Sequence, residues 1–419
     1  MTYVPEKIIR VPIDGMVDVS DYIPIIDSPA FQRLDEVKQL DVADVVYPGA
    51  KHTRFEHSLG TMEKFRKLFI HRDNSNSDLT MDDLKRVELV SLIHDDPHNA
   101  YGHLTEVIEQ ALTGHTHDDR WLETVKPHYE EPLRECGFSV EDLEKVVETN
   151  LKEIIWDIIG VDKLDYLQRD LYHIGFQRPD IEPQKKYTIF LKSRGLCIEE
   201  RDKNMVTSFI NNWYMAHNEI YWNKPSLIVA TMMRRAIWDA ISQGRLELEE
   251  MRDMRDWEVK TILKSSPGRA GDLLKRMLDR RLSKAAITFR MSGYENFERI
   301  KKKPLTVVGI PEEQVNNFVT ENVDFKRILE LESELSRELN TDIMVSTTPQ
   351  PERLKPKDPK VYSTDRDEIR NLSDINPAFF KYQQDMPKNM WAARILVPKE
   401  DRKRVSGEVE MIKQYLLNP

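Results

Sequence analysis

The chain has 419 residues, of which 40% are hydrophobic and 32% are charged, and its formal net charge is -10. This length supports a sizeable core in two or three structural units. The acidic balance disfavours an extensive nucleic-acid surface, which needs a basic domain, but it leaves room for a local basic pocket that binds a polyphosphate.

Cysteine usage and hydropathy exclude further classes of protein. The two cysteines, Cys136 and Cys197, form no CxxC pair, which disfavours a disulfide scaffold or a cysteine-type zinc site. The N-terminus lacks the apolar stretch of a signal peptide, and no apolar run is long enough to span a membrane. We therefore expect a cytoplasmic protein with no membrane partner.

The first 55 residues contain short apolar runs broken by Pro and Gly. They predict an extended N-terminal segment, with room for a small hairpin, and a first helix over 29–40. A loop rich in Gly and Pro is predicted at 47–50.

From 54 to about 241 the pattern is helical. Thr80 and Asp83 resemble a capping box, and apolar residues at helical spacing follow them. Pro97 predicts that this helix ends near His94 and Asp95, because helices usually stop before a proline.

The rest of the chain divides into two textures. Residues 245–290 are interpreted as charged helices, with 275–290 as a solvated basic face. Beyond 305 we expect strands at 306–308, 343–345 and 393–397, helices at 325–339 and 400–417, and a loop at 347–360. The prediction is a mainly α protein with three units: an extended segment and first helix (1–55), a helical domain with a helical extension (56–300) and a small α+β C-terminal region (301–419).

Four scattered residues suit one divalent metal ion: His57, the adjacent pair His94 and Asp95, and Asp162. They lie in three predicted helical segments, and metal sites inside bundles are built from side chains on facing helices. Nitrogen and oxygen ligands with open positions allow a metal to activate water and hold a phosphate. A lone His-Asp pair is common by chance, but seven of the eleven histidines lie between His57 and His117, which favours metal or acid–base chemistry.

Longer runs carry a resemblance to a known family. The run YPGAKHTRFEHSLG from Tyr47 to Gly60, the His94-Asp95 pair and the run DKLDYLQRD from Asp162 to Asp170 resemble the HD-domain phosphohydrolases. The match is closest to the deoxynucleoside triphosphate triphosphohydrolases, and its motifs lie within residues 1–225. The resemblance implies that the helical domain is an HD-domain bundle and that the protein is a metal-dependent phosphohydrolase.

The resemblance also implies roles for individual residues. The metal ligands would be His57, His94, Asp95 and Asp162. Proton transfer would fall to His103, Glu106 and His117, with His98 near the triphosphate. The residues that would contact the phosphates or the deoxyribose, and so form the substrate pocket, are Arg54, Lys163, Gln39, Tyr166, Asp170, His217 and Tyr221, with Lys224 nearby. Asp170 would meet the 3′-hydroxyl, and Tyr221 would crowd the 2′ position and reject ribonucleotides.

The same residues have plainer readings without the resemblance. Tyr166 and Tyr221 could be core aromatics, and Arg54 and Lys163 ordinary surface charges. Asp162 could cap a helix, which is compatible with metal binding.

Four departures from the family pattern put substrate identity and effector use in doubt. Asp96 and Pro97 replace an apolar residue and a glycine after the His94-Asp95 pair, and the extra carboxylate could attract a second cation or face solvent. Gly160 replaces an acidic residue of a close relative, and Trp213 replaces a phosphate-binding arginine. Asp35 replaces an arginine that helps to bind a nucleotide effector.

The leading hypothesis is a dNTP triphosphohydrolase that releases a deoxynucleoside and inorganic triphosphate. It needs one divalent metal, for which Mn, Fe, Zn and Mg remain candidates. The alternatives are an HD-type nucleotidase or phosphodiesterase, and a non-catalytic nucleotide sensor. The expected partners are a dNTP substrate, an optional nucleotide effector and further copies of the chain in a homo-oligomer; nucleic acid is not favoured.

Overall fold

The computed structural model describes residues 6–70, 78–115, 119, 121–176, 188–191, 193–297, 305–321, 324–348 and 358–417. The described chain begins with an antiparallel hairpin of β1 (Ile8–Val11) and β2 (Gly15–Asp18), followed by the short helices α1 (Ile23–Ile26) and α2 (Pro29–Arg33). The hairpin agrees with the prediction for this segment.

The helix predicted over 29–40 is wrong in its second half. After α2 a 3-10 turn covers Leu34–Glu36, Val37 is extended, Lys38 forms an isolated bridge with Thr53, and turns follow. The reason is a long-range pairing: the Arg54 amide donates to the Val37 carbonyl at 2.9 Å, and the Gln39 amide donates to the His52 carbonyl at 3.1 Å. These bonds replace helical ones and hold Gln39 beside the start of the next helix.

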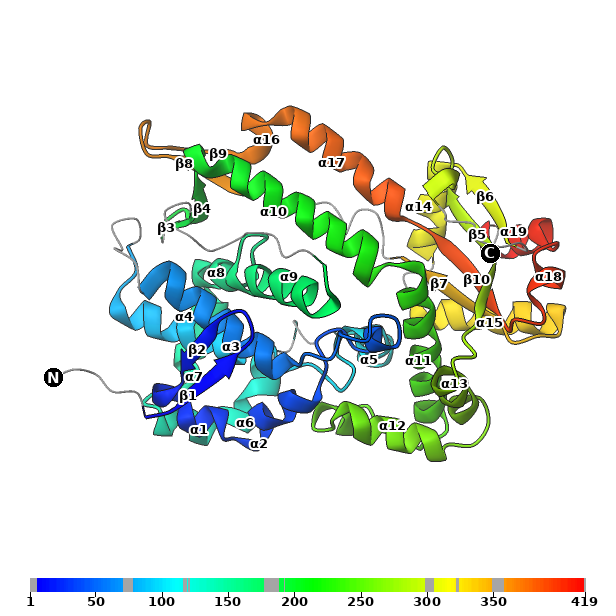
Figure 1. The fold of residues 1–419 in the computed structure, drawn as a ribbon, viewed down its shortest axis with the longest axis horizontal. Helices are drawn as coiled ribbons and strands as arrows, with labels where there is room; N and C mark the ends of the chain where they lie inside the picture. The colour runs from blue at the N-terminus through cyan, green and yellow to red at the C-terminus, as the bar shows by residue number, and fades with distance from the viewer. Residues whose placement is uncertain are drawn as a thin grey trace.

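A body of packed helices follows and buries a large apolar core (Figure 1). Its helices are α3 (Arg54–Phe65), α4 (Met81–Ile93), α5 (Gly102–Thr113), α6 (Trp121–Glu135), α7 (Val140–Val147), α8 (Glu153–Trp156) and α9 (Val161–Ile174). The predicted capping box of Thr80 and Asp83 is confirmed at the start of α4, and α4 ends at the predicted place, with His94 as its C-cap.

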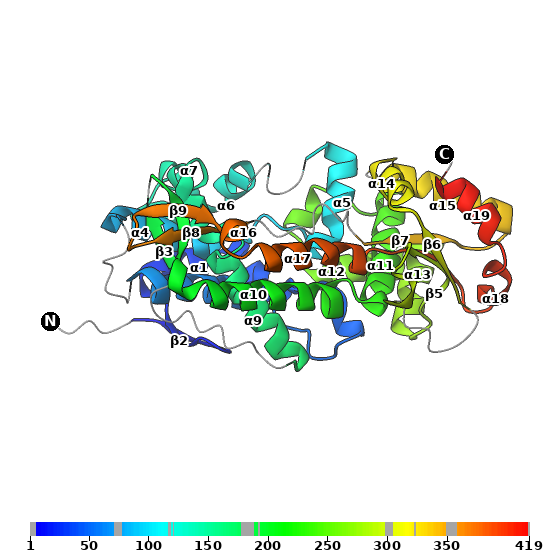
Figure 2. The ribbon, with the colours of Figure 1, turned by 90° about the horizontal axis from the view of Figure 1, so that it is seen from above.

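A small sheet interrupts the predicted helical run. The strands β3 (Thr188–Leu191) and β4 (Gly195–Glu199) precede α10 (Lys203–Ala216) and α11 (Lys224–Ser242). Two later strands, β8 (Lys360–Ser363) and β9 (Glu368–Asn371), complete this sheet in the order β3-β4-β8-β9. After α16 (Leu372–Ile375), α17 (Pro377–Met390) runs beside α10 (Figures 1 and 2), and a hydrogen bond of 2.7 Å from Gln383 to Asn211 joins them.

The remaining elements form a second mixed sheet with helices. They are α12 (Asp256–Ser265), α13 (Arg269–Leu278), β5 (Lys284–Met291), β6 (Thr306–Ile310), α14 (Glu312–Glu321), α15 (Phe325–Leu339), β7 (Met344–Thr347), β10 (Ala393–Val397), α18 (Arg402–Val405) and α19 (Val409–Leu417). The strand order is β6-β5-β10-β7.

The three predicted strands and the helix at 325–339 are confirmed. The charged helices predicted over 245–290 are present as α12 and α13, but the basic helical face predicted over 275–290 is wrong beyond the end of α13, because β5 is a buried strand. The predicted helix at 400–417 is divided into α18 and α19.

The mainly α fold class is confirmed, and the two four-stranded sheets of the described residues do not follow the predicted units. The second sheet crosses residue 300, since β5 precedes that position and β6 follows it. Residues 358–390 return from the C-terminal region to the helical body (Figure 1). The unit boundaries themselves stay a prediction.

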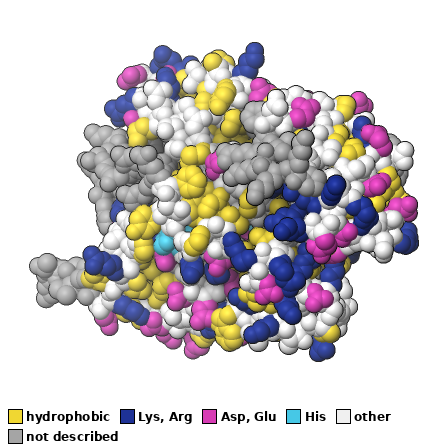
Figure 3. All heavy atoms as spheres, turned by 45° about the vertical axis from the view of Figure 1, so that its right-hand side comes forward, with side chains coloured by type: hydrophobic (Ala, Val, Ile, Leu, Met, Phe, Trp, Pro, Cys, Tyr) yellow, Lys and Arg dark blue, Asp and Glu magenta, His cyan; other side chains and the backbone are white. Residues whose placement is uncertain are grey.

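The surface and the helices bear on possible partners. On the face that Figure 3 shows, several Lys and Arg side chains lie close together to the right of the centre, with Asp and Glu side chains among and around them. Among the described residues, no helix is long and apolar enough to cross a bilayer.

Candidate metal centre and active site

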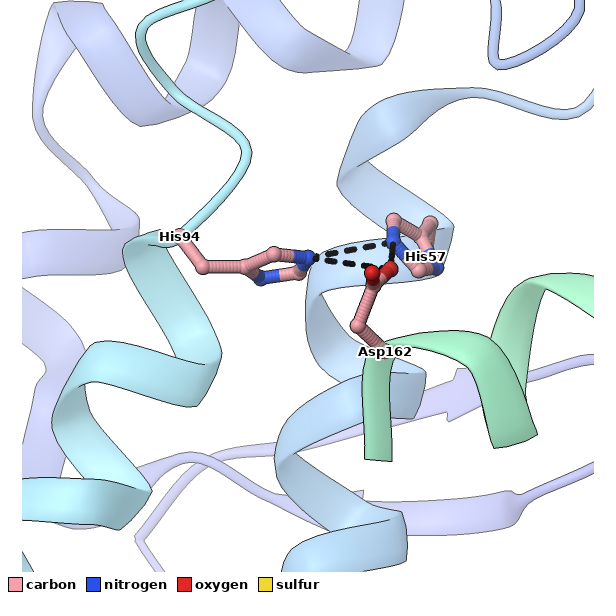
Figure 4. A group of neighbouring side chains, drawn as sticks. All are labelled: His57, His94 and Asp162. Carbon is pink, nitrogen blue, oxygen red and sulfur yellow. Dashed lines mark hydrogen bonds and ion pairs between the residues drawn. The ribbon is translucent and has the colours of Figure 1, made fainter. Parts of the chain in front are cut away.

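Three of the predicted ligands converge from three helices (Figure 4). His57 lies in the first turn of α3, His94 caps the C-terminus of α4, and Asp162 lies in the first turn of α9. Their ligand atoms all lie within 4.8 Å of one another. The two Nε2 atoms are 3.2 Å apart, and Asp162 Oδ1 lies 3.2 Å from His57 Nε2 and 3.5 Å from His94 Nε2.

The other ring nitrogens are held by partners outside this group. His57 Nδ1 lies 2.9 Å from Asp165 Oδ2, and His94 Nδ1 lies 2.9 Å from the Ser91 carbonyl. Because these oxygens can accept from Nδ1–H, each ring in its neutral form would present the lone pair of Nε2 to the point that Asp162 also faces, and a metal ion bound there would take the place of the Nε2 proton. Two imidazole lone pairs and a carboxylate facing one point fit a divalent metal ion.

The electrostatics of the group favour positive charge at the same point. Burial alone would lower the pKa of His57, but hydrogen bonds with Asp162 and Asp165 outweigh it and raise this pKa to about 10. Although burial would raise the pKa of Asp162, the two histidines hold it well below its usual range. A cation is therefore stabilised where the three side chains meet.

The fourth predicted ligand, Asp95, lies beside this group and is turned toward Arg54. Its Oδ2 accepts a hydrogen bond from Arg54 Nη1 at 2.6 Å, and its Oδ1 lies 3.4 Å from His98 Nδ1. Against the effect of burial, Arg54, His57 and His94 lower the pKa of Asp95 to about 2. Asp95 is thus ionised next to the metal group.

The two predicted phosphate clamps differ in their surroundings. Arg54 is fully buried, so it is not an ordinary surface charge, and its Nε and Nη2 atoms have no hydrogen-bond partner within the described part of the chain. Leaving buried guanidinium donors without acceptors costs free energy, and a bound anion would accept hydrogen bonds from these two. Lys163 donates instead to the Trp156 carbonyl at 2.9 Å, with its Nζ 3.7 Å from Asp162.

The predicted proton-transfer residues lie on and before α5. His103 is 62% exposed, and its Nδ1 lies 3.4 Å from Glu106 Oε2, one helical turn later. The His98 ring packs edge-on against His103 with centroids 4.6 Å apart. His117 lies outside the described residues. Three of the four predicted residues thus form a chain of neighbouring side chains that starts at Asp95 and runs through His98 and His103 to Glu106.

The predicted sugar-contacting residues cluster around Asp170. Tyr221 donates to Asp170 Oδ2 at 2.5 Å, and His52 Nε2 lies 2.7 Å from Asp170 Oδ1. Tyr166 lies near Tyr221, with ring centroids 6.4 Å apart. Gln39 is buried in its loop, and its Oε1 has no hydrogen-bond partner among the residues described.

Trp213 and His217 close the other side of Tyr166. Trp213 Nε1 donates to the Tyr166 hydroxyl at 3.0 Å, and the Trp213 and His217 rings approach to 3.9 Å between centroids. Burial lowers the pKa of His217 to about 4, so this ring is neutral near pH 7. The wall formed by these rings is aromatic and uncharged.

Sequence reasoning missed the residues that support the ligands. Asp165 holds His57 and is held in turn by Arg169 through Nε and Nη2 at 2.9 and 2.8 Å. The only available signal was that Asp165 follows Asp162 by one helical turn. His52, the partner of Asp170, was visible only as part of the YPGAKHTRFEHSLG run.

Two of the departures now have a physical account. The extra carboxylate, Asp96, neither faces solvent nor joins the metal group: it is buried, and its Oδ1 accepts from the Tyr129 hydroxyl at 3.1 Å. Gly160 precedes α9, where an added Cβ would lie 2.3 Å from the Ile155 carbonyl oxygen. A side chain at 160 therefore does not fit this backbone.

Comparisons with known proteins identify relatives of this chain. The family model described as "HD associated region" matches residues 189–415. An uncharacterised protein of Methanocaldococcus jannaschii is 28% identical over 91% of this chain and 77% of its own length. The deoxynucleoside triphosphate triphosphohydrolase SAMHD1 of Danio rerio is 25% identical over 67% of this chain and 55% of its own length.

Two solved structures share the fold over nearly the whole chain. A phosphohydrolase from Bacteroides thetaiotaomicron has a TM-score of 0.68 at 19% identity, and covers 94% of this chain with all of its own. A hypothetical protein from Aquifex aeolicus has a TM-score of 0.70 at 22% identity, over 96% of this chain and 99% of its own. By contrast, the chain spans about half the length of the SAMHD1 relative.

Proposed function

The chain belongs to the HD-domain phosphohydrolases, and we propose that it is a metal-dependent dNTP triphosphohydrolase, which releases a deoxynucleoside and inorganic triphosphate. One observation carries the proposal: a group of imidazole and carboxylate side chains that could hold a metal lies beside a buried arginine, two of whose nitrogen atoms have no partner among the described residues. A metal bound there would polarise a phosphate oxygen and activate water. The sequence similarity to SAMHD1 supports the choice of a dNTP as substrate.

In this proposal His57, His94 and Asp162 hold the metal, and Asp95 completes the ligand set because it is ionised and adjacent. Arg54 donates hydrogen bonds from Nε and Nη2 to the phosphates. Lys163 gives up its hydrogen bond to the Trp156 carbonyl and brings a second positive charge to the phosphates. Donors that already point at the developing charge stabilise the transition state without reorganising.

Proton transfer is assigned to the exposed end of the site. His103 is accessible, and Glu106 is placed to orient its ring, so an imidazole there can exchange protons with the leaving group and with water. His98 lies between this pair and the phosphate side of the site, because its ring contacts His103 and its Nδ1 lies near Asp95. His117 stays a candidate for the same task.

The sugar pocket is assigned to the group around Asp170. With Tyr221 and His52 on its two oxygens, the carboxylate is fixed in place and can accept from a sugar hydroxyl as well. The Tyr221 ring would stand against the 2′ position. Gln39, Tyr166 and His217 would complete the wall.

One observation favours a second candidate, an HD-type nucleotidase. The wall made by Trp213 and His217 is neutral, so it offers no cation to a long phosphate tail. A monophosphate substrate would need fewer cations than a triphosphate.

A product assay separates the candidates. Purified protein with Mn²⁺ or Mg²⁺ is incubated with each dNTP, the four dNTPs together, NTPs and deoxynucleoside monophosphates, and the products are separated by chromatography. We expect inorganic triphosphate and a deoxynucleoside from at least one dNTP, and none after metal chelation.

Matched variants tie the activity to the metal group. His57→Ala should abolish turnover, whereas His115→Ala, which changes an exposed histidine outside the group, should not. Survival of all dNTPs with cleavage of a monophosphate would replace the proposal by the nucleotidase. Nucleotide-dependent assembly without any turnover would point to a sensor, and light scattering with and without nucleotide reports that assembly.

A further inference from the structure

Asp41 is an acidic residue to which the proposed reaction gives no role. It lies in the loop between α2 and α3, and its φ of 50° is left-handed, which is uncommon for a residue with a side chain. Its Oδ1 is buried and has no hydrogen-bond partner among the described residues. Both features cost free energy, and such costs concentrate at functional sites.

The other oxygen of Asp41 caps α5. Oδ2 accepts from the Leu104 amide at 3.1 Å, and the same amide reaches the Tyr101 carbonyl at 3.0 Å. Tyr101, the N-cap residue of α5, provides no side-chain cap of its own. The first amides of a helix need acceptors and favour a negative charge. Asp41 therefore supplies, from a distant loop, the cap that α5 lacks.

Gly102, the first residue of α5, brings Arg54 to the same place. A Cβ at Gly102 would lie 2.1 Å from Arg54 Nη2 and 2.9 Å from Asp41 Oδ1. Arg54 Nη2 and Asp41 Oδ1 both lack a hydrogen-bond partner in the described part of the chain. Arg54 also pairs with Asp95, and Asp41 also accepts from the Leu104 amide, so neither side chain is wholly unpaired. The two atoms without a partner lie near each other at a residue that has no side chain, where the attraction between the two charges is stronger than in water.

We propose that Asp41 is a positioning residue, which couples the guanidinium of Arg54 to the start of α5. The coupling would fix the phosphate-binding side of the site relative to His103, the second residue of α5. The roles of Arg54 and His103 rest on the proposed function, whereas the coupling is a property of the fold.

The charge of Asp41 depends on the groups around it. Burial raises its pKa to about 7, Arg54 and His103 act to lower it, and Asp256 acts to raise it. Arg234, which donates to the Leu104 carbonyl, is a further cation in reach. The carboxylate is thus ionised above about pH 7, where it can serve as a counter-charge.

Two substitutions separate the charge from the backbone. Asp41→Asn keeps an oxygen for the Leu104 amide and tolerates the left-handed conformation, but it removes the charge. Asp41→Gly removes the cap and the charge and also relieves the backbone. Asp367 is a matched control, because it is an exposed aspartate with a φ of 51° in the turn between β8 and β9.

Hydrogen–deuterium exchange and steady-state kinetics above pH 7 test the coupling. We expect Asp41→Gly to speed exchange in 101–113 and to lower kcat/KM about 10- to 100-fold, mainly through kcat. The unfolding temperature of Asp41→Gly should stay close to that of the wild type. In exchange rate and in kcat/KM, Asp41→Asn should lie between the wild type and Asp41→Gly. Asp367→Asn and Asp367→Gly should match the wild type in every readout.

Unchanged exchange in 101–113 of Asp41→Gly would overturn the proposal, and so would a kcat/KM within twofold of the wild type. The exchange measurement needs no substrate. If the wild type cleaves no dNTP, the proposed function fails, but exchange still decides the coupling, and the kinetics use whichever phosphate ester is turned over.

Discussion

The proposed metal ligand His57 is oriented by a second carboxylate. Asp165 Oδ2 accepts from its Nδ1 at 2.9 Å, and Arg169 holds Asp165 through two hydrogen bonds. A carboxylate in this position fixes the ring and makes the other nitrogen a better ligand. We expect Asp165→Asn to weaken Mn²⁺ binding about 10- to 100-fold, as measured by calorimetric titration.

The neighbouring Asp14 provides the control at the residue scale. Asp14 Oδ2 accepts from the same Arg169 at 2.8 Å, and Asp14 also pairs with Lys64 and Lys67, so it acts on Arg169 without contacting the ring of His57 through an ion pair. Asp14→Asn should therefore lower stability and leave metal affinity near that of the wild type. Equal losses of affinity in both variants would mean that Asp165 acts through general stability and not through His57.

At the scale of elements, the start of α9 sets the place of Asp162. Gly160 lies close to the Ile155 carbonyl: a Cβ added at Gly160 would lie 2.3 Å from the Ile155 carbonyl oxygen. Gly160→Ala must shift the first turn of α9, at a cost of about 1–3 kcal/mol. Since Asp162 lies in that turn, metal affinity should fall together with stability, which thermal unfolding and metal titration measure on the same sample.

Two other glycines serve as controls for this prediction. Gly271→Ala, in α13, meets the Ser266 carbonyl at 2.2 Å and should cost stability but spare metal binding. Gly407→Ala meets its nearest atom at 3.4 Å and should change neither. A Gly160→Ala protein that binds metal as tightly as the wild type would show that α9 absorbs the change.

The elements that carry the metal group could be predicted because their signals are local. The capping box of Thr80 and the apolar spacing after it fix α4 without reference to the rest of the chain. The second half of the helix at 29–40 could not be predicted, since Val37 and Gln39 pair with residues that come after the next loop. β5 is basic in part, yet it is buried between β6 and β10, and only long-range pairing decides that.

The same distinction holds for the candidate site. His57, His94 and Asp162 stand out by residue type and context. Asp165 does not, because a carboxylate on a helix is usually solvated and its partner His57 is 108 residues away. Asp41, with its positive φ, gives no local signal either, because the amide that it caps, that of Leu104, is 63 residues away.

At the scale of the whole molecule, the helical body and the C-terminal sheet share a core. Leu104 and Ile108 of α5, in the helical body, belong to the same apolar cluster as residues of α11, α12 and α13 and as Ala285 of β5, Met344 of β7 and Leu396 of β10. The segment 358–390 returns to the body and completes its small sheet. The described parts therefore depend on each other, and we expect them to unfold together.

A buried ion pair at this junction tests that expectation. Arg235 of α11 donates to Glu332 of α15 through Nε at 2.6 Å and through Nη2, and Glu332 also accepts from the Val345 amide of β7 at 2.6 Å. Both side chains are almost fully buried. Glu332→Ala leaves a buried cation unpaired, which should cost about 3–5 kcal/mol.

Replacing both partners should cost less than breaking the pair. Arg235→Met combined with Glu332→Leu fills the space with apolar groups and leaves no charge behind, so its stability should lie above that of Glu332→Ala and below that of the wild type by about the 1–3 kcal/mol that the Val345 amide loses with its acceptor. Urea unfolding followed by tryptophan fluorescence and by circular dichroism should give coincident single transitions for all three proteins. Separate transitions in Glu332→Ala would instead mean that the sheet and the helical body fold independently, because losing one contact at their junction would then release one part while the other stays folded.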